Sequence, residues 1–205
     1  MSPVRVVDEE MRAYYERRAR EYDDWWHGTG LFAQRDRPGW AAEVDELIAA
    51  IGTLEPARTL DVACGTAFLT RHIPGHVTGL DQSQTMVEVA ARRLAQGSVV
   101  RADAVPLPFD DGSFERVFTG HFYGHLLPEE RAAFLAEARR VAPRLVVADS
   151  ALHEGVAPEQ WQERVLDDGS RHRVYKRYFT GAGLAAELGG GEVLHQGRWF
   201  VLVAA

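Results

Sequence analysis

The run TLDVACGTAFLTR at 59–71 constrains the fold of this 205-residue chain more than any other stretch. Residues 60–62 have the apolar character of a short buried strand, 63–66 are small and include one glycine, and 67–73 return to helical spacing. A strand, a tight turn of small residues and a helix together let a backbone approach a nucleotide-like ligand closely. Asp61, at the end of the predicted strand, would face a ligand that carries positive charge.

A second acid follows the next predicted strand, at 76–80. Asp81 closes that strand and lies twenty positions after Asp61. An acid at this place is positioned to accept hydrogen bonds from ribose hydroxyls. Because two acids flank one crevice, the sequence predicts a ligand that contains an adenosyl group.

The loop resembles that of the class I methyltransferases that use S-adenosylmethionine, and the resemblance covers most of the chain. The family's loop reads acid, any residue, Gly, any residue, Gly, any residue, Gly. This chain keeps Asp61 and the middle glycine, Gly65, and it departs from the pattern at Ala63 and Ala67. Alanine preserves small size at both places but adds a methyl group where the cofactor comes close.

Three further stretches match the family in the expected order. They are GLDQS at 79–83, Met86, and RADAVPLPFDDGSFERVF at 101–118. The resemblance implies S-adenosylmethionine as cofactor and S-adenosylhomocysteine as its product. It implies cofactor contacts at these residues: Tyr15, Tyr22, Asp61, Ala63, Gly65, Asp81, Gln82, Met86, Asp103, Ala104 and Thr119.

Two of these assignments stay open at the level of sequence. Met86 either packs against adenine, as its family position implies, or fills the core as methionines commonly do. Asp103 either accepts a hydrogen bond from the adenine amine or is a solvated acid in a turn.

Composition limits the class of protein. The length and a hydrophobic content of 46% suit one domain, 1–205, with an ordinary core. A net charge of −7 argues against a general nucleic-acid binder, which needs a basic face. We find no apolar signal core and no run long enough to span a bilayer, so we expect a cytoplasmic protein with a small-molecule substrate. The oligomeric state is not determined by these features.

Strand and helix patterns alternate along most of the chain, which predicts an α/β fold. We expect a Rossmann-like, seven-stranded, mostly parallel sheet with helices on both faces and a C-terminal antiparallel hairpin. The predicted helices span 8–26, 37–51, 67–72, 83–94, 127–140 and 180–188. The further predicted strands span 77–80, 99–102, 114–119, 145–148, 171–179, 192–195 and 199–203.

Two segments are expected to frame the site. In the first, at 8–35, the predicted helix begins with Asp8 as its N-cap and is rich in aromatic residues. Tyr15 and Tyr22 are seven residues apart and share one helix face, so the helix either packs on the core or closes over the cofactor as a lid. The second segment, 151–180, is expected to be an insertion on the substrate side.

The residues that follow the fourth strand lie where open α/β sheets bind ligands. His121 is our candidate general base because an unperturbed imidazole titrates near neutral pH. The alternative is a histidine that bonds a backbone group or shapes the pocket. His121 and His125 have the spacing of a zinc-binding helix, but the glutamate and a third ligand are missing, so we predict no metal.

A dense basic stretch lies between the fifth strand and the final hairpin. It is either a solvated face or a selector for an anionic substrate. Together, RVLDDG followed by RVYK and the GHFYGHL run resemble a branch of the family that includes a phosphonate O-methyltransferase. That resemblance implies that Arg164 and Lys176 hold an acidic group, with His125 on the substrate side.

These observations favour transfer of a methyl group from S-adenosylmethionine to a small molecule, with oxygen as the acceptor atom. A catalytically silent sensor of the same ligand stays open because of Ala63 and Ala67. A nicotinamide-dependent oxidoreductase shares the strand, turn and helix but needs G-x-G-x-x-G. Gly65 is the single glycine between Asp61 and Ile73, and Asp61 would repel a pyrophosphate.

Overall fold

The computed structural model describes residues 9–94 and 96–205. Its main sheet consists of β1 (Ala57–Val62), β2 (Gly75–Asp81), β3 (Ser98–Arg101), β4 (Arg116–Gly120), β5 (Arg144–Ser150), β8 (Glu192–Gln196) and β9 (Phe200–Ala204). The strand order is β3-β2-β1-β4-β5-β9-β8. The first five strands are parallel, whereas β9 runs antiparallel to both β5 and β8. The predicted class of fold, including its C-terminal hairpin, is confirmed.

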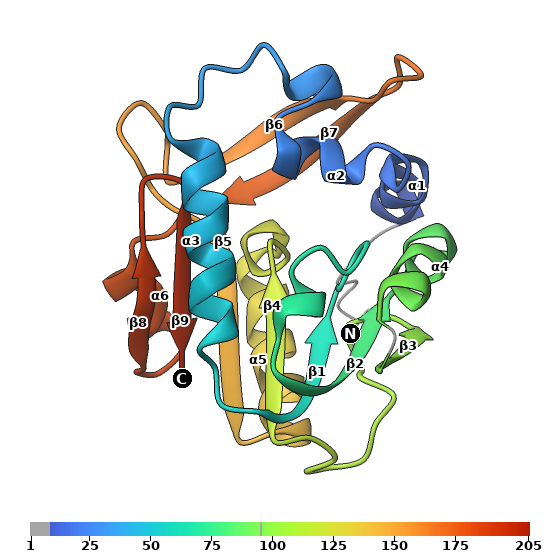
Figure 1. The fold of residues 1–205 in the computed structure, drawn as a ribbon, viewed down its shortest axis with the longest axis vertical. Helices are drawn as coiled ribbons and strands as arrows, with labels where there is room; N and C mark the ends of the chain where they lie inside the picture. The colour runs from blue at the N-terminus through green and yellow to red at the C-terminus, as the bar shows by residue number, and fades with distance from the viewer. Residues whose placement is uncertain (1–8, 95) are drawn as a thin grey trace.

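Helices cover both faces of this sheet (Figure 1). They include α3 (Trp40–Gly52), α4 (Gln84–Arg93), α5 (Pro128–Val141) and α6 (Gly181–Glu187). Neighbouring residues of β4 point to opposite faces, as the pleat requires. Phe118 packs with Leu47 of α3, and Val117 packs with Phe134 of α5. Burial on both faces explains the continuous apolar runs of β5 and β9.

Hydroxyl side chains cap two of the helices. The Ser83 hydroxyl accepts a hydrogen bond from the Met86 backbone N–H at the start of α4. The Thr180 hydroxyl does the same for the Gly183 N–H at the start of α6. Both side chains satisfy a backbone donor that has no partner inside its helix.

The N-terminal segment forms two helices, so the prediction of one helix over 8–26 is wrong. The helices are α1 (Glu9–Arg18) and α2 (Tyr22–His27), and the turn η1 (Gly30–Phe32) follows them. The chain turns at 19–21, where Glu21 is buried and its carboxylate accepts a hydrogen bond from the Asp167 backbone N–H. This long-range bond favours a bend over a continued helix. The predicted N-cap, Asp8, lies outside the described residues.

Two other helices begin later in the structure than the sequence predicted, and the reason is the same for both. Ala67 has a φ of 61° and Gly39 has a φ of 75°, both in the left-handed region. A right-handed helix cannot include such a residue. The predicted helix 67–72 is therefore reduced to the turn η2 (Thr70–His72), and α3 starts at Trp40.

A separate two-stranded antiparallel sheet is formed by β6 (Glu159–Val165) and β7 (Arg171–Arg177). The extended character of 171–179 is confirmed over β7, whereas β6 was not predicted as a strand. In Figure 1 this hairpin lies beside α1 and α2, beyond the end of the main sheet at which β1 points. It is attached to the end of β5, because the Phe179 N–H donates to the Ser150 carbonyl. The hairpin therefore sits where ligands bind in this fold.

The final hairpin is held to α3 by one carboxylate. Glu43, of which 9% is exposed, accepts hydrogen bonds from three successive backbone N–H groups, those of Arg198, Trp199 and Phe200, at 2.7–3.0 Å. We expect Glu43→Ala to lower the free energy of unfolding by about 2 to 4 kcal/mol, because these donors lose their acceptor. Urea denaturation would measure it, with Glu46→Ala on the exposed face of α3 as control. Equal losses in the two variants would contradict this role.

Candidate active site

The loop after β1 has a strained backbone. Ala63, Gly65 and Ala67 have φ angles of 59°, 55° and 61°. The left-handed region is easily adopted by glycine and costs an alanine about 1 to 2 kcal/mol. The two alanines therefore adopt the conformation that the family's glycines would adopt more easily. Strain of this kind persists where the surrounding structure enforces it, and it is typical of ligand sites.

Asp61 is a buried carboxylate without a counter-charge. It is 2% exposed, and one of its oxygens accepts a hydrogen bond from the Thr70 hydroxyl at 2.6 Å. The other oxygen, Oδ1, has no partner among the described residues. Burial raises the pKa of Asp61 to about 8. It lines a small cavity of about 10 Å³ with Ala63 and Gly120, so a cationic group placed there would meet an unpaired acceptor.

Asp81 is oriented by the backbone around it. Its two carboxylate oxygens accept hydrogen bonds from the Gly65 N–H and the Ser83 N–H, both at 2.9 Å. Burial raises the pKa of Asp81 to about 6, and these backbone bonds oppose that rise. The loop and the second acid are thus joined directly, as the sequence predicted from two acids beside one crevice.

The remaining predicted cofactor residues have varied surroundings. Met86 is 1% exposed, and the buried Oε1 atom of Gln82 has no partner in the described chain. The Thr119 hydroxyl donates to the Val62 carbonyl and thereby ties β4 to β1. Ala104 packs at the edge of the main core.

Helices α1 and α2 cover the cleft that these residues form. Glu16 accepts hydrogen bonds from the Ser83 hydroxyl at 2.6 Å and from the Thr85 N–H at 3.1 Å. Arg12 pairs with Asp103 at 2.7 Å. The ring of Tyr22 lies against Gly65, where an added Cβ would be 3.4 Å from a ring carbon. These contacts place α1 and α2 directly against Ser83 and against the predicted cofactor residues Asp103 and Gly65.

Tyr22 separates two cavities, because it lines both the small cavity at Asp61 and a larger one of about 270 Å³. We call the larger one the acceptor cavity. It brings together all four residues that the sequence proposed for catalysis and substrate binding: His121, His125, Arg164 and Lys176. Tyr15, which the resemblance placed on the cofactor, lines this cavity too and lies at a ring centroid distance of 6.5 Å from His125.

His121 is strained, buried and neutral. Its φ is 55°, and its ring packs edge-on against Trp25 and Trp26 at centroid distances of 4.8 and 4.9 Å. Burial lowers the pKa of His121 to about 3, despite the opposing effect of Asp149. Its Nε2 atom has no partner among the described residues. An imidazole with such a pKa is a weak base.

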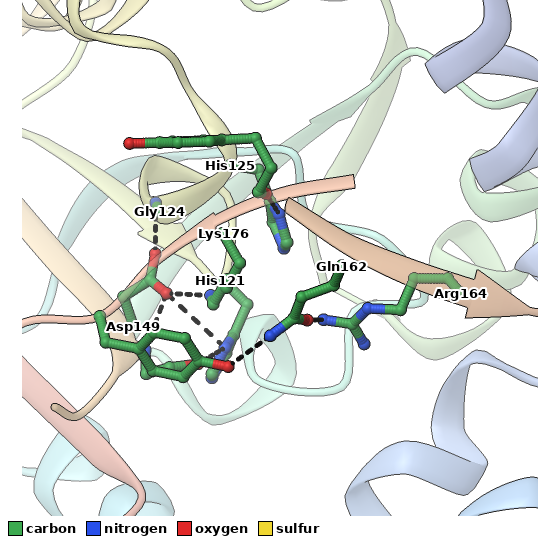
Figure 2. Close-up of polar contacts among 10 residues, drawn as sticks. His121, Gly124, His125, Asp149, Gln162, Arg164 and Lys176 are labelled. Atoms are coloured by element: carbon green, nitrogen blue, oxygen red, sulfur yellow. Dashed lines mark hydrogen bonds and ion pairs between the residues drawn. The ribbon is translucent and has the colours of Figure 1, made fainter. Parts of the chain in front are cut away.

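Lys176 is held in place by Asp149, a residue that the sequence analysis did not single out. Their ion pair measures 2.6 Å, and neither side chain is more than 4% exposed (Figure 2). Asp149 also accepts a hydrogen bond from the Gly124 N–H at 2.7 Å and lies 3.9 Å from Nδ1 of His121. Lys176 and its neighbours hold the pKa of Asp149 below its usual value despite burial. In the sequence, Asp149 could have been identified as a site residue from its position at the end of the apolar run that forms β5.

Arg164 belongs to a polar chain that runs along the cavity (Figure 2). Its Nη2 donates to the side-chain carbonyl of Gln162 at 2.5 Å, and the Gln162 amide donates to the Tyr178 hydroxyl at 2.7 Å. His125 points its Nδ1 at the Tyr175 carbonyl, at 2.7 Å, and burial holds its pKa well below the usual value. The Nε–H of Arg164 has no acceptor in the described residues.

In the described parts of the chain, no three His, Cys, Asp or Glu side chains gather closely enough to hold a metal ion.

Comparisons with known proteins find methyltransferases. The family model described as "Methyltransferase domain" matches residues 60–144. The demethylmenaquinone methyltransferase of Thermotoga maritima is 37% identical over 110 residues, which are 51% of this chain and 46% of that protein. The O-methyltransferase cnsE of Penicillium expansum is 38% identical over 120 residues, which are 51% and 44% of the two chains.

Two solved structures are similar over almost the whole chain. They are described as "DhpI-SAM-HEP complex" and "DhpI-SAH complex structure", with TM-scores of 0.72 and 0.71 and 26% identity. Each comparison covers 96% of this chain and 94–95% of the other. The fold is that of the class I S-adenosylmethionine-dependent methyltransferases, and residues 60–144 match the methyltransferase domain.

The extent of these similarities differs between the comparisons. This methyltransferase chain spans less than half the length of the curated relatives described above. The part that they share holds the loop at Gly65 and the sheet, whereas the hairpin β6–β7 lies outside the matched family domain. Among the described helices, none combines the length and the apolar character needed to cross a lipid bilayer.

The raised pKa of Asp61 leads to a prediction of how the stability of the fold depends on pH. The pKa of Asp61 is about 8 in the folded chain and near 3.9 in an unfolded one, so between these values the folded state binds the extra proton and stability falls as pH rises. Asparagine cannot ionise. We therefore expect Asp61→Asn to raise the free energy of unfolding at pH 8 by about 2 to 5 kcal/mol relative to the parent, and by about 1 kcal/mol at most at pH 4.

Urea unfolding at pH 4, 6 and 8 without added ligand would measure this difference. Asp45→Asn, on the exposed face of α3, is the matched control and should show no such pH dependence. A stability change for Asp61→Asn that is the same at pH 4 and pH 8 would contradict the raised pKa.

Proposed function

We propose that this chain transfers a methyl group from S-adenosylmethionine to an oxygen of a small anionic molecule. The observation that carries the proposal is the acceptor cavity, in which Arg164 and Lys176 lie together and which shares Tyr22 with the small cavity at Asp61. The similarity to chains described with SAM and SAH supports the cofactor, and the methyltransferase relatives support the reaction class.

The residues of the loop fit this cofactor. Oδ1 of Asp61 is an orphaned buried acceptor that suits a cationic amino group, and Asp81 is oriented toward the cleft as a ribose acceptor. We assign Met86 and Asp103 to the adenine, as the family resemblance implies. When bound, S-adenosylmethionine supplies a methyl group on a positively charged sulfur.

The side chains of the acceptor cavity orient the substrate. Arg164 presents an unsatisfied Nε–H, and a guanidinium binds a planar or tetrahedral anion through two parallel hydrogen bonds. Lys176 supplies a second charge, which Asp149 holds at a fixed position. Tyr22 and the indole of Trp25 line the cavity and exclude water from it. Orientation of this kind accounts for much of the acceleration of a one-step displacement.

The neutral state of His121 bears on the acceptor group. Loss of a proton from an alcohol calls for a base, and His121 is the candidate for that role in the cavity. Its low pKa makes it poorly suited in this form. An acidic oxygen is already ionised at neutral pH and needs no base, so we favour an oxygen of the anionic group itself as the acceptor.

The pH dependence of turnover tests the role of His121. We expect His121→Asn, which tolerates the positive φ, to reduce kcat by about tenfold or less, because the acceptor oxygen needs no proton removed. We also expect the profile of kcat between pH 6 and 9 to keep its shape. A loss of about a thousandfold, together with the disappearance of an acidic limb from the profile, would make His121 the general base.

Release of S-adenosylhomocysteine tests the proposed function. The parent should release it with small carboxylates, phosphonates or phosphate monoesters and not with neutral alcohols of the same size. Arg164→Gln should raise KM for the active acid by about tenfold or more, since a hydrogen bond between charged groups is lost. Arg173→Gln, on the exposed side of the same hairpin, is the control and should leave KM within about twofold.

The alternatives predict other results in the same assay. A silent sensor would bind S-adenosylmethionine and release no product with any acceptor. An oxidoreductase would bind NAD in preference, which the lone glycine at Gly65 and the buried acid at Asp61 disfavour. Turnover with neutral alcohols alone would contradict an anionic substrate.

A further inference from the structure

The acceptor cavity carries more positive charge than one acidic group would balance. Three parts of the chain contribute basic side chains to it: Arg18, Arg35, Arg37, Arg164 and Lys176. Asp36 is the one carboxylate among the described residues that line it. This concentration occurs in a chain with a net charge of −7, so it does not reflect overall composition.

Lys176 is ion-paired with Asp149, and Arg18, Arg37 and Arg164 are bonded to uncharged groups. Arg18 donates to the Tyr14 hydroxyl at 2.7 Å, and Arg37 donates to the Trp25 carbonyl at 3.1 Å. Within the described residues, neither of these guanidiniums has a carboxylate at ion-pairing distance, and the same holds for Arg35. Their charges are therefore available to a ligand.

Arg18 and Arg35 lie against one aromatic ring. Their guanidinium carbons are 5.4 and 4.7 Å from the ring centre of Phe32. Only 5% of Arg18 is exposed, and a buried charge without a counter-ion is unfavourable. The pKa of Arg35 is lowered by burial first and then by repulsion from Arg164 and Arg18.

Glu21 is the acid that lies near Arg18, and it does not offset this charge. Its carboxylate accepts the Asp167 N–H, and burial raises the pKa of Glu21 above its usual value. Glu21 is not among the described residues that line the acceptor cavity, so a ligand in the cavity meets Arg18 and not this acid. The excess positive charge in the cavity thus calls for a further anion.

We propose that Arg18, Arg35 and Arg37 form a second anion-binding subsite, and that the substrate is a small molecule with two acidic groups. The inference rests on the proposed function, in which Arg164 and Lys176 hold the first acid. Guanidinium groups match carboxylates and phosphates alike through paired hydrogen bonds, and we assign a carboxylate to the second subsite because it is the smaller of the two groups. The volume of about 270 Å³ restricts the substrate to the size of a short-chain diacid.

A matched pair of ligands tests the second subsite. Calorimetric titration with S-adenosylhomocysteine at saturation would compare 3-phosphonopropionate with propylphosphonate, which has a methyl group in place of the carboxylate. The parent should bind 3-phosphonopropionate about tenfold more tightly or better. Arg35→Gln, an exposed position that tolerates change, should abolish this preference and leave propylphosphonate binding within about twofold. Arg92→Gln, exposed on α4, is the control.

Each outcome has a distinct meaning. Equal affinities for the two ligands, both weakened by Arg164→Gln, would overturn the second subsite and leave the proposed function standing. Equal weakening of both ligands by Arg35→Gln would also overturn it, because the arginine would then serve the first acid. Binding of S-adenosylhomocysteine without binding of either phosphonate would overturn the anionic substrate and this inference together.

Discussion

The site depends on a carboxylate that the fold buries without a partner. Asp61 ends β1 beneath the loop, and its Oδ1 is unbonded while its pKa rises to about 8. No arrangement of the core requires an acid there, and the chain carries a stability cost at neutral pH to keep it. A ligand with a positively charged amino group removes that cost. The strained alanines beside it, Ala63 and Ala67, give the same indication, because backbone strain is retained where a ligand must come close.

A second buried charge organises the other half of the site. Asp149 fixes Lys176, approaches His121 and receives the Gly124 N–H, so it connects β5, β7 and the segment after β4. Tyr22 lies between the two halves and contacts both cavities. The same N-terminal helices that supply Tyr22 also cover the cofactor cleft through Arg12 and Glu16. The N-terminal helices therefore contact both the predicted cofactor residues and the acceptor cavity.

Features set by consecutive residues were predictable from the sequence. Asp61 and Asp81 directly follow buried strands, and the caps Ser83 and Thr180 directly precede helices. Features that depend on distant residues were not. Lys176 and Asp149 are 27 positions apart, and Arg12 and Asp103 are 91 apart. The helix predicted at 67–72 failed because the backbone of Ala67 is forced into the left-handed region by its surroundings. β6 escaped prediction because one of its faces is polar and the other mixes glutamates with Trp161 and Val165, so no regular apolar alternation marks it.

The most direct measurement is a titration of the chain with S-adenosylhomocysteine near pH 7 in buffers of different ionisation enthalpy. Because the pKa of Asp61 is raised, its carboxyl group is largely protonated before the ligand's amino group arrives. We expect one ligand per chain and a net release of protons that Asp61→Asn abolishes. Absence of binding at millimolar ligand, or equally tight binding without proton release in both proteins, would contradict the assignment of Asp61 to the cofactor.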